Sequence, residues 1–382
     1  MKKLDFVFFD AGGGHRSAAI ALKSIIEQQG RPWEVRLVDL KDILTSLDII
    51  RKCTGISMEE VYNRLLKKGW TLGSGQLLAA MHLLIRIYHG GQVKLLKKFW
   101  LESRPDLVVS LIPNFNRALY QSLAEALPAS PLVTILTDLA DYPPHFWIER
   151  QPQYLICGTD RAAEQAYALG HAGDRVFRTS GMILRPGFYQ PIEACRREER
   201  RKLGLDPDLP TGLVLFGGEG SEWMIEITRT LSQASMKLQL ILICGKNKTL
   251  KQRLEQMTPR FPVFIEGFTS QVPYYMHLSD FFIGKPGPGS ISEAIAMKLP
   301  VVVERNIWTL PQERYNTAWI RENKLGVVLK SFRDIQAGLV ELLEPANFDR
   351  YRRNAAAVNN RAVFEIPEIL AELMESGIMS GG

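Results

Sequence analysis

A regular alternation of short apolar runs and helical segments, which occurs twice, constrains the fold of this chain more than any other feature. In the first half, the apolar runs are at 4–9, 35–40, 107–112, 132–137 and 154–158. In the second half, they are at 212–216, 238–244, 263–266, 281–283 and 301–304. Apolar runs of this length are typical of buried parallel strands, and their alternation with helices predicts doubly wound sheets. We therefore expect an α/β protein with two Rossmann-like domains.

The alternation breaks at the Phe-Tyr-Gln-Pro segment 188–191, and a charged stretch follows at 196–202. We therefore expect a first domain over 1–189, a second over 190–362 and a helix in 363–382 that packs back on one of them. The chain has 382 residues, enough for two hydrophobic cores. Such domains would face each other across a cleft at the carboxyl ends of their strands, where open α/β sheets bind ligands.

The positive charge of the chain is concentrated in one stretch. The formal net charge is +6, and residues 51–104 alone hold ten Lys and Arg against three acids. An apolar run lies there between Trp70 and Trp100, with Lys97 and Lys98 near its end. This mixture is typical of a helix on an anionic membrane surface, and the alternative is a core helix with a solvated basic face. No motif of a nucleic-acid-binding fold accompanies it, so we expect no nucleic-acid partner.

The four cysteines are far apart in the chain, at Cys53, Cys157, Cys195 and Cys244. They form no C-x-x-C pair and have no histidine at metal-ligand spacing, so we expect neither a disulfide framework nor a structural zinc. The N-terminal apolar stretch is short and is interrupted by Asp5, which does not fit a signal peptide. No apolar run approaches the roughly 18 residues of a spanning helix. These features favour a cytoplasmic protein.

The first glycine-rich loop joins the first strand to the first helix, between Asp10 and His15. Its glycines, which include Gly13 and Gly14, permit close backbone approach and leave free N–H groups at a helix start. The spacing differs from G-x-G-x-x-G, which disfavours a dinucleotide site. An imidazole at such a helix start can act as a general base near neutral pH. The simpler alternatives are a tight turn and a structural histidine.

Two turns in the second half combine glycine with polar side chains directly after strands, at 216–221 and 284–293. A third segment, at 311–316, clusters amide and carboxylate groups of the kind that bind sugar hydroxyls. In the second turn, N–H groups at the start of the following helix would favour an anion. Glu293, one turn into that helix, can accept hydrogen bonds from both hydroxyls of a ribose. The simpler alternatives are a tight turn, an acid that merely suits the helix dipole and a solvated helix start.

Taken in chain order, these motifs resemble the group of glycosyltransferase family 28 that contains the monogalactosyldiacylglycerol synthases and diacylglycerol glucosyltransferases. The resemblance is carried by Gly-Gly-Gly-His-Arg at 12–16, Gly-Gly-Glu-Gly at 217–220, Gly-Phe at 267–268, the segment 285–294 and Gln-Glu at 312–313. Each motif is weak alone, but together they occur in the same order over most of the chain.

The resemblance implies a GT-B fold, a UDP-sugar donor, diacylglycerol as acceptor, and inversion at the anomeric carbon with neither a metal nor another cofactor. It places the donor largely in the second domain, on Gly218, Glu219, Gly220, Ser221, Gly267, Phe268, Gly287, Gly289, Ser290, Glu293, Gln312 and Glu313. It assigns the acceptor side to His15 as catalytic base, with Asp10 close by. The residues expected next to the acceptor or the membrane are Gly13, Gly14, Trp70, Lys97, Lys98, Trp100 and His145.

The segment that follows Thr137 departs from the family. Relatives show a His-Pro pair four residues after the Thr-Asp-Leu motif, whereas this chain has Pro143 and Pro144 there, followed by His145. This departure concerns the tip of the loop and therefore the acceptor specificity. We therefore expect transfer of galactose or glucose from a UDP-sugar to diacylglycerol at the inner face of the cell membrane. The alternatives are another lipid acceptor, a UDP-sugar 2-epimerase of the same fold, and a non-catalytic protein that binds UDP-sugar or membranes.

Overall fold

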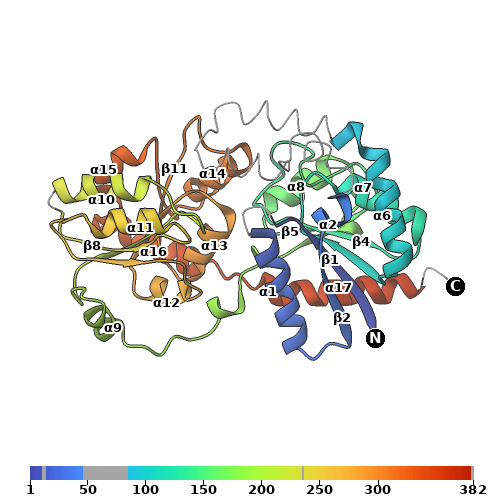
Figure 1. Cartoon of the computed structure of the whole chain (residues 1–382), viewed down its shortest axis with the longest axis horizontal. Coiled ribbons are helices and arrows are strands. Elements are labelled where there is room, and N and C mark those ends of the chain that lie inside the picture. Colours follow the sequence, from blue (N-terminus) through green and yellow to red (C-terminus); the bar gives the residue numbers. More distant parts are fainter. Residues whose placement is uncertain (11–13, 46–84, 235, 380–382) are drawn as a thin grey trace. The chain divides into compact units, whose positions relative to one another are not determined.

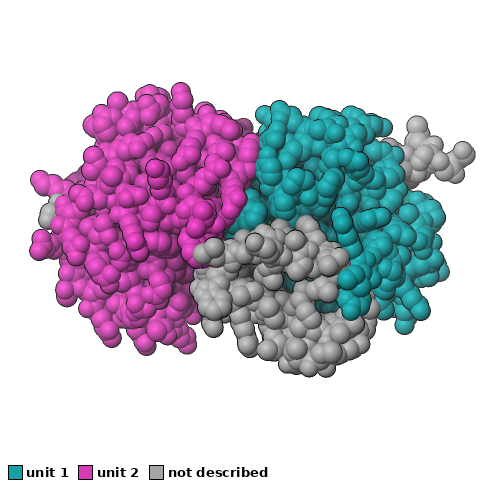
Figure 2. Space-filling model, turned by 90° about the horizontal axis from the view of Figure 1, so that it is seen from above, with its two compact units in different colours: residues 1–186, 310–312, 360–382 teal, residues 187–309, 313–359 magenta. Residues whose placement is uncertain are grey.

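The computed structural model describes residues 1–10, 14–45, 85–234 and 236–379 of the chain. The chain forms two compact units, coloured separately in Figure 2. The first comprises residues 1–186, 310–312 and 360–382, and the second comprises residues 187–309 and 313–359. Two of these boundaries lie within three residues of the expected ones at 189 and 362, whereas residues 310–312 were expected in the second domain.

The first unit is a parallel six-stranded sheet flanked by helices (Figure 1). The strand order is β2-β1-β3-β4-β5-β6. The strands are β1 (Lys2–Phe8), β2 (Trp33–Asp39), β3 (Leu107–Ser110), β4 (Leu132–Ile135), β5 (Tyr154–Cys157) and β6 (Val176–Arg178). The helices are α1 (Gly14–Gln28), α2 (Leu40–Leu44), α6 (His89–Ser103), α7 (Asn116–Ala126), α8 (Asp160–Ala168) and α17 (Ala362–Met379). The apolar runs therefore form the interior strands, because β3 and β4 are buried at every residue.

The second unit is a second parallel six-stranded sheet, in the order β12-β11-β10-β7-β8-β9. Its strands are β7 (Thr211–Leu215), β8 (Gln239–Ile243), β9 (Val263–Glu266), β10 (Phe281–Gly284), β11 (Val301–Glu304) and β12 (Gly326–Leu329). Its helices are α9 (Arg196–Lys202), α10 (Trp223–Gln233), α11 (Lys248–Glu255), α12 (Val272–His277), α13 (Pro288–Ala296), α14 (Arg314–Glu322), α15 (Ile335–Leu343) and α16 (Pro345–Ala357). The expected α/β class with two Rossmann-like sheets is confirmed.

The C-terminal helix α17 belongs to the first unit and lies against α1 (Figure 1). Arg31, just after α1, forms an ion pair with Glu368 of α17. Glu365 accepts a hydrogen bond from the backbone of Ser180 at 2.8 Å. Polar contacts therefore fix α17 at two points along its length. Among the described residues, no helix has the length and apolar character needed to cross a bilayer.

Each sheet has one point where the chain reverses its winding direction. In the first sheet this point lies between β1 and β3, and in the second it lies between β7 and β10. Ligands of open α/β sheets bind beside the carboxyl ends of the strands at such points. In each unit, a glycine-rich loop singled out in the sequence follows one of these strands.

Candidate functional site

His15 lies at the start of α1, beside the carboxyl ends of the first sheet. Its Nδ1 atom is 2.9 Å from the hydroxyl oxygen of Thr137, which follows β4. The edge of its ring packs against Trp147, with 5.8 Å between the ring centroids. Burial lowers the pKa of His15 to about 4, against the smaller opposing effect of a hydrogen bond to the backbone of Leu111. The imidazole is therefore neutral at neutral pH and able to accept a proton.

Two buried carboxylates hold the loop that carries Trp147. The indole N–H of Trp147 donates to Asp138 at 2.9 Å. The backbone N–H groups of Trp147 and His145 donate to Asp141, at 2.6 and 3.0 Å. Burial raises the pKa of the Asp141 carboxyl. Sequence reasoning assigned no role to Asp138 or Asp141, although the Thr-Asp pair after β4 marked this loop.

The other residues expected near His15 lie in different settings. The carboxylate of Asp10 accepts a hydrogen bond from Arg16 at 2.8 Å, and none joins the two described residues Asp10 and His15. Gly14 opens α1, and Gly13 lies outside the described residues. His145 is exposed, and its Nδ1 atom is 3.3 Å from the carbonyl oxygen of Ile148. The structure thus pairs Asp10 with Arg16.

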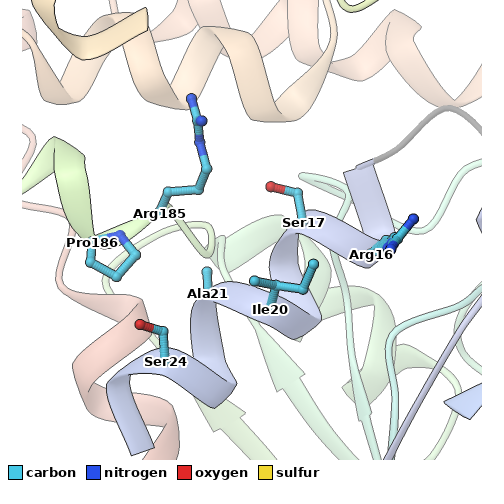
Figure 3. Close-up of a pocket in the computed structure, with 7 residues that line it drawn as sticks. All are labelled: Arg16, Ser17, Ile20, Ala21, Ser24, Arg185 and Pro186. Atoms are coloured by element: carbon cyan, nitrogen blue, oxygen red, sulfur yellow. The ribbon is translucent and has the colours of Figure 1, made fainter. Parts of the chain in front are cut away.

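A groove of about 350 Å³ runs along the face of α1 that does not pack on the sheet (Figure 3). Its floor is formed by Ile20, which is 45% exposed, and by Ala21. The remaining lining comes from Arg16, Ser17, Ser24, Arg185 and Pro186. The groove thus begins one residue after His15 and continues along the same helix. Its apolar floor and basic mouth suit an amphipathic molecule better than a fully polar one.

Trp100 corrects the membrane assignment made from the sequence. It is fully buried in the first core, and its indole N–H donates to the hydroxyl of Ser122 at 2.9 Å. A tryptophan with a satisfied N–H in a core cannot contact a lipid surface. The sequence led to the wrong assignment of Trp100 because α6 alternates buried apolar and exposed basic residues. Trp100 lies on the buried side of this helix. Trp70 lies outside the described residues.

The solvent-facing side of α6 is partly basic and partly apolar. Lys98 pairs loosely with Glu102 at 3.9 Å, and Lys97 pairs with Glu125 at 3.2 Å. The side chain of Lys98 is 78% exposed, and Leu101 is 48% exposed one turn further along. Lys94, Lys98 and Leu101 share one exposed face of α6 at helical spacing, and the exposed Ile87 lies just before the helix. We call these four residues the α6 stripe.

In the second unit, the turn after β7 is built on glycines. Gly217 and Gly220 have φ angles of 74° and 64°, in the left-handed region that favours glycine. The turn after β8 packs on this turn, with the N–H of Lys246 donating to the carbonyl oxygen of Gly218 at 2.8 Å. A side chain at Gly245 would overlap that same oxygen. This packing fixes Gly218, Glu219, Gly220 and Ser221, four of the expected donor residues.

The turn after β10 lies next to the turn after β7, because Gly284 pairs with Leu215 in the sheet. Gly287 is the N-cap of α13, and no described side chain caps the helix. The N–H groups of Gly289 and Ser290 fall in the first turn, where a helix offers no internal acceptor. Beyond its own helix, Gly289 faces open space, because a methyl group added there would meet no atom within 4 Å. An anion beside this helix start would meet free donors and the positive end of the dipole.

The polar segment after β11 supplies one residue to the place where these turns lie, at the reversal point of the second sheet. We call this place the crevice. Glu313 is 8% exposed, and its carboxylate lies 3.5 Å from the ammonium of Lys285. Its neighbour Gln312 is partly buried in the short helix 311–313. Glu293 is partly buried and lies one turn further along α13 than Gly289. The structure therefore brings together the turns after β7 and β10 with Glu313, and sequence reasoning did not predict the pairing of Lys285 with Glu313.

Gly267 and Phe268 lie after β9, at the edge of the same sheet. The N–H of Gly267 donates to the carboxylate of Glu266 at 2.7 Å, and that carboxylate also accepts from Tyr275 at 2.7 Å. Phe268 is 67% exposed, and the ammonium of Lys246 lies 5.5 Å from its ring centroid. An exposed aromatic ring on a fixed turn is a platform on which a flat base can stack. Across the described residues, no cluster of three His, Cys, Asp or Glu side chains has the arrangement of a metal site.

Known proteins of similar sequence share nearly the whole chain. The chain is 28% identical over 390 residues to a probable monogalactosyldiacylglycerol synthase of Glycine max, covering 98% of this chain and 72% of that protein. It is 27% identical over 394 residues to monogalactosyldiacylglycerol synthase 1 of Arabidopsis thaliana, covering 98% of this chain and 71% of that protein.

Solved structures share the fold at lower identity. MurG of Acinetobacter baumannii superposes with a TM-score of 0.60 at 12% identity, over 97% of this chain and 100% of MurG. The UDP-GlcNAc 2-epimerase of Neisseria meningitidis gives 0.58 at 14% identity, over 97% of this chain and 100% of the epimerase. The architecture of the chain is thus that of the GT-B glycosyltransferases and their relatives. Residues 213–359 match the model of the glycosyltransferase family 28 C-terminal domain.

Proposed function

We propose that this protein is an inverting glycosyltransferase that moves a hexose from a UDP-sugar to diacylglycerol at a membrane surface. The observation that carries the proposal is the crevice at the reversal point of the second sheet. There, two glycine turns, an uncapped helix start and Lys285 lie within the domain that matches glycosyltransferase family 28. The similarity to galactolipid synthases over 98% of the chain supports the lipid acceptor.

The donor fits the crevice by its charge and its hydrogen-bonding groups. The diphosphate would bind the N–H groups at the start of α13 and the turn at 217–221, where the helix dipole favours negative charge. Glu293 would accept hydrogen bonds from the ribose, and Phe268 would stack on the uracil. Gln312 and Glu313 would accept hydrogen bonds from the hydroxyls of the sugar. The N–H groups also stabilise the charge that develops on the leaving diphosphate, so we propose that transfer needs no metal or other cofactor.

The reaction is a single displacement in which His15 acts as the base. The acceptor hydroxyl oxygen attacks the anomeric carbon from the face opposite the diphosphate and forms the new glycosidic bond. The bond between the anomeric carbon and the diphosphate oxygen breaks, and its electron pair leaves with UDP. The neutral imidazole takes the hydroxyl proton. Thr137 and Trp147 hold the ring, and the groove along α1 offers an apolar surface next to it for the hydrocarbon part of the acceptor.

The α6 stripe is the surface proposed to meet the lipid. Its two lysines would attract anionic headgroups, and Ile87 and Leu101 would enter the interface. The protein would then act from the cytoplasm, peripherally bound to the inner face of the cell membrane. Nucleic acid is not a proposed partner.

A second function is kept open by the fold. A UDP-GlcNAc 2-epimerase shares the architecture with a TM-score of 0.58, so the fold alone does not separate transfer from epimerisation. His145 is exposed and follows two prolines that replace the His-Pro pair of the family, so another lipid is an alternative acceptor. A non-catalytic protein would bind UDP-sugar or vesicles without releasing UDP.

The deciding experiment is UDP release from a panel of UDP-sugars, with and without diacylglycerol in anionic vesicles. We expect release from UDP-galactose or UDP-glucose that depends on diacylglycerol. Turnover of a UDP-sugar at the same rate without any acceptor would favour the epimerase. Binding of UDP-sugar without any turnover would favour the non-catalytic protein.

A further inference from the structure

The side chain of Lys285 lies across both glycine turns of the donor crevice. A methyl group built on Gly217 would lie 3.7 Å from the Cε atom of Lys285, and one built on Gly287 would lie 3.4 Å from it. The side chain of Lys285 therefore passes within van der Waals range of both turns. At its end, the ammonium reaches Glu313 at 3.5 Å.

The ion pair between Lys285 and Glu313 is uneven. The side chain of Glu313 is 11% exposed, whereas that of Lys285 is 49% exposed. A separation of 3.5 Å is longer than a good charge-assisted hydrogen bond of about 2.8 Å. A nearly buried carboxylate needs strong partners to offset its desolvation. Glu313 thus holds its cation loosely and can accept better hydrogen bonds from another source.

The backbone next to Lys285 is tied to a neighbouring helix, while the side chain of Lys285 is half exposed. The side-chain amide of Asn316, which is fully buried, donates to the carbonyl oxygen of Pro286 at 2.8 Å. This bond ties the turn after β10 to α14, the helix that follows Glu313. A change of partner by Lys285 therefore needs only rotation of its flexible four-carbon chain.

We propose that donor binding exchanges the partners of this ion pair. The rest of this inference depends on the proposed function, because it assigns the ligands of the same crevice. On binding, the ammonium of Lys285 leaves Glu313 for the diphosphate, and the carboxylate of Glu313 accepts hydrogen bonds from the hydroxyls of the donor sugar. The intact donor therefore gives each of the two residues a new partner.

The exchange discriminates between the donor and the product UDP. UDP alone would attract Lys285 but would leave the carboxylate of Glu313 nearly buried without a partner, which is unfavourable. After transfer, the sugar is lost from the crevice, and Glu313 competes again with the diphosphate for Lys285. The pair therefore weakens UDP binding relative to UDP-sugar binding and favours product release.

Calorimetric titration of uridine, UDP and UDP-hexose, without an acceptor, tests this exchange. Lys285→Met should weaken UDP binding by about tenfold and leave uridine binding unchanged, since a close charge contact is worth about 1.4 kcal/mol or more. Lys285→Arg should restore most of the UDP affinity, and Lys237→Met, at the opposite end of the sheet, should have no effect. Glu313→Gln should strengthen UDP binding by about three- to tenfold and weaken UDP-hexose binding.

Three outcomes would overturn the exchange. The first is that Glu313→Gln binds UDP with the affinity of the parent, and the second is that Lys285→Met loses uridine and UDP affinity equally. The third is that Glu313→Gln still strengthens UDP binding in a protein that already carries Lys285→Met. Failure of the parent protein to bind UDP at all would instead overturn the proposed function. Thermal unfolding of each variant separates these outcomes from loss of the fold.

Discussion

The Nδ1 atom of His15 and the hydroxyl oxygen of Thr137 lie 2.9 Å apart, although 122 residues separate them in the chain. The strand order explains the contact, because β1 and β4 lie on either side of β3 and their carboxyl ends share one edge. The contact orients the imidazole in the proposed mechanism. Thr137 is therefore a positioning residue for His15.

Replacing His15 tests its role as a base. We expect His15→Ala to lower kcat by about 10²- to 10⁴-fold, the usual contribution of a positioned general base. The affinity for UDP should stay unchanged, because His15 belongs to the first unit and the residues proposed to bind UDP belong to the second. Calorimetry with UDP and initial-rate kinetics give the two values. Equal losses in kcat and in UDP affinity would contradict the base role.

Thr137→Val should reduce kcat less than His15→Ala does, by about tenfold or below, because the ring keeps its contact with Trp147. The pH profile distinguishes this effect from damage to the fold. Loss of the hydroxyl should shift the acid limb of the profile, whereas a loss of folded protein would scale all rates equally.

The lowered pKa of His15 predicts acid sensitivity. The unfolded chain protonates this histidine near its ordinary pKa of 6.5, and the folded protein does so near 4. Its neutral form thus contributes full stability above about pH 6.5, and this contribution is lost as the pH falls toward 4. Urea unfolding at about pH 7.5 and about pH 5 should show a smaller loss of stability for His15→Ala than for the parent. An imidazole that titrates near pH 6.5 in the folded protein, followed by NMR, would contradict the assignment.

Substitutions at Trp100 and in the α6 stripe should affect different properties: the first should lower stability and the second should lower membrane binding. Trp100→Ala should destabilise the protein by about 3–5 kcal/mol, as loss of a buried aromatic does. Lys94→Glu with Lys98→Glu should leave the unfolding free energy nearly unchanged and reduce binding to anionic vesicles several-fold. Urea unfolding and vesicle sedimentation measure the two effects. Unchanged sedimentation of the double variant would remove the stripe from the membrane proposal.

The packing of two glycine turns predicts a local effect on the donor site. Gly245→Ala should weaken UDP binding, because its methyl group would displace Gly218, which is proposed to face the diphosphate. Gly204→Ala is the matched control, since it also has a positive φ, of 72°, but no atom lies within 4 Å of the added methyl group. The control should cost about 1–2 kcal/mol of backbone strain without loss of UDP affinity. Similar UDP affinity in the two variants would contradict the structural link between the turns.

The proposed charge stabilisation by Lys285 and the start of α13 predicts independence from divalent metal. Dialysis against EDTA should leave the rate of UDP release unchanged. A loss of activity that Mg²⁺ or Mn²⁺ restores would show that the diphosphate needs a cation beyond those of the chain.

Most strands of the two sheets were predictable from sequence because buried parallel strands appear as uninterrupted apolar runs. The exceptions have physical reasons. β6 has only three residues, and β12 and helices α14 to α16 follow the last apolar run that the pattern revealed. Trp100 was misplaced because sequence alone does not show which face of α6 is buried.

The candidate site was predictable only in part. The glycine turns were visible because glycine after a strand marks a strand-to-helix turn. The pairs Lys285–Glu313 and His15–Thr137 were not visible, because they depend on which strands are neighbours in each sheet. The buried carboxylates of Asp138 and Asp141 were missed for the same reason, since only the folded loop brings them to Trp147.

The most direct test of the central claim is analysis of the lipid product by mass spectrometry and NMR. Vesicles that contain diacylglycerol would be incubated with the full chain and UDP-galactose or UDP-glucose. We predict a hexosyl-diacylglycerol whose anomeric configuration is inverted relative to the donor. Recovery of unmodified diacylglycerol together with an epimerised or intact UDP-sugar would contradict the account.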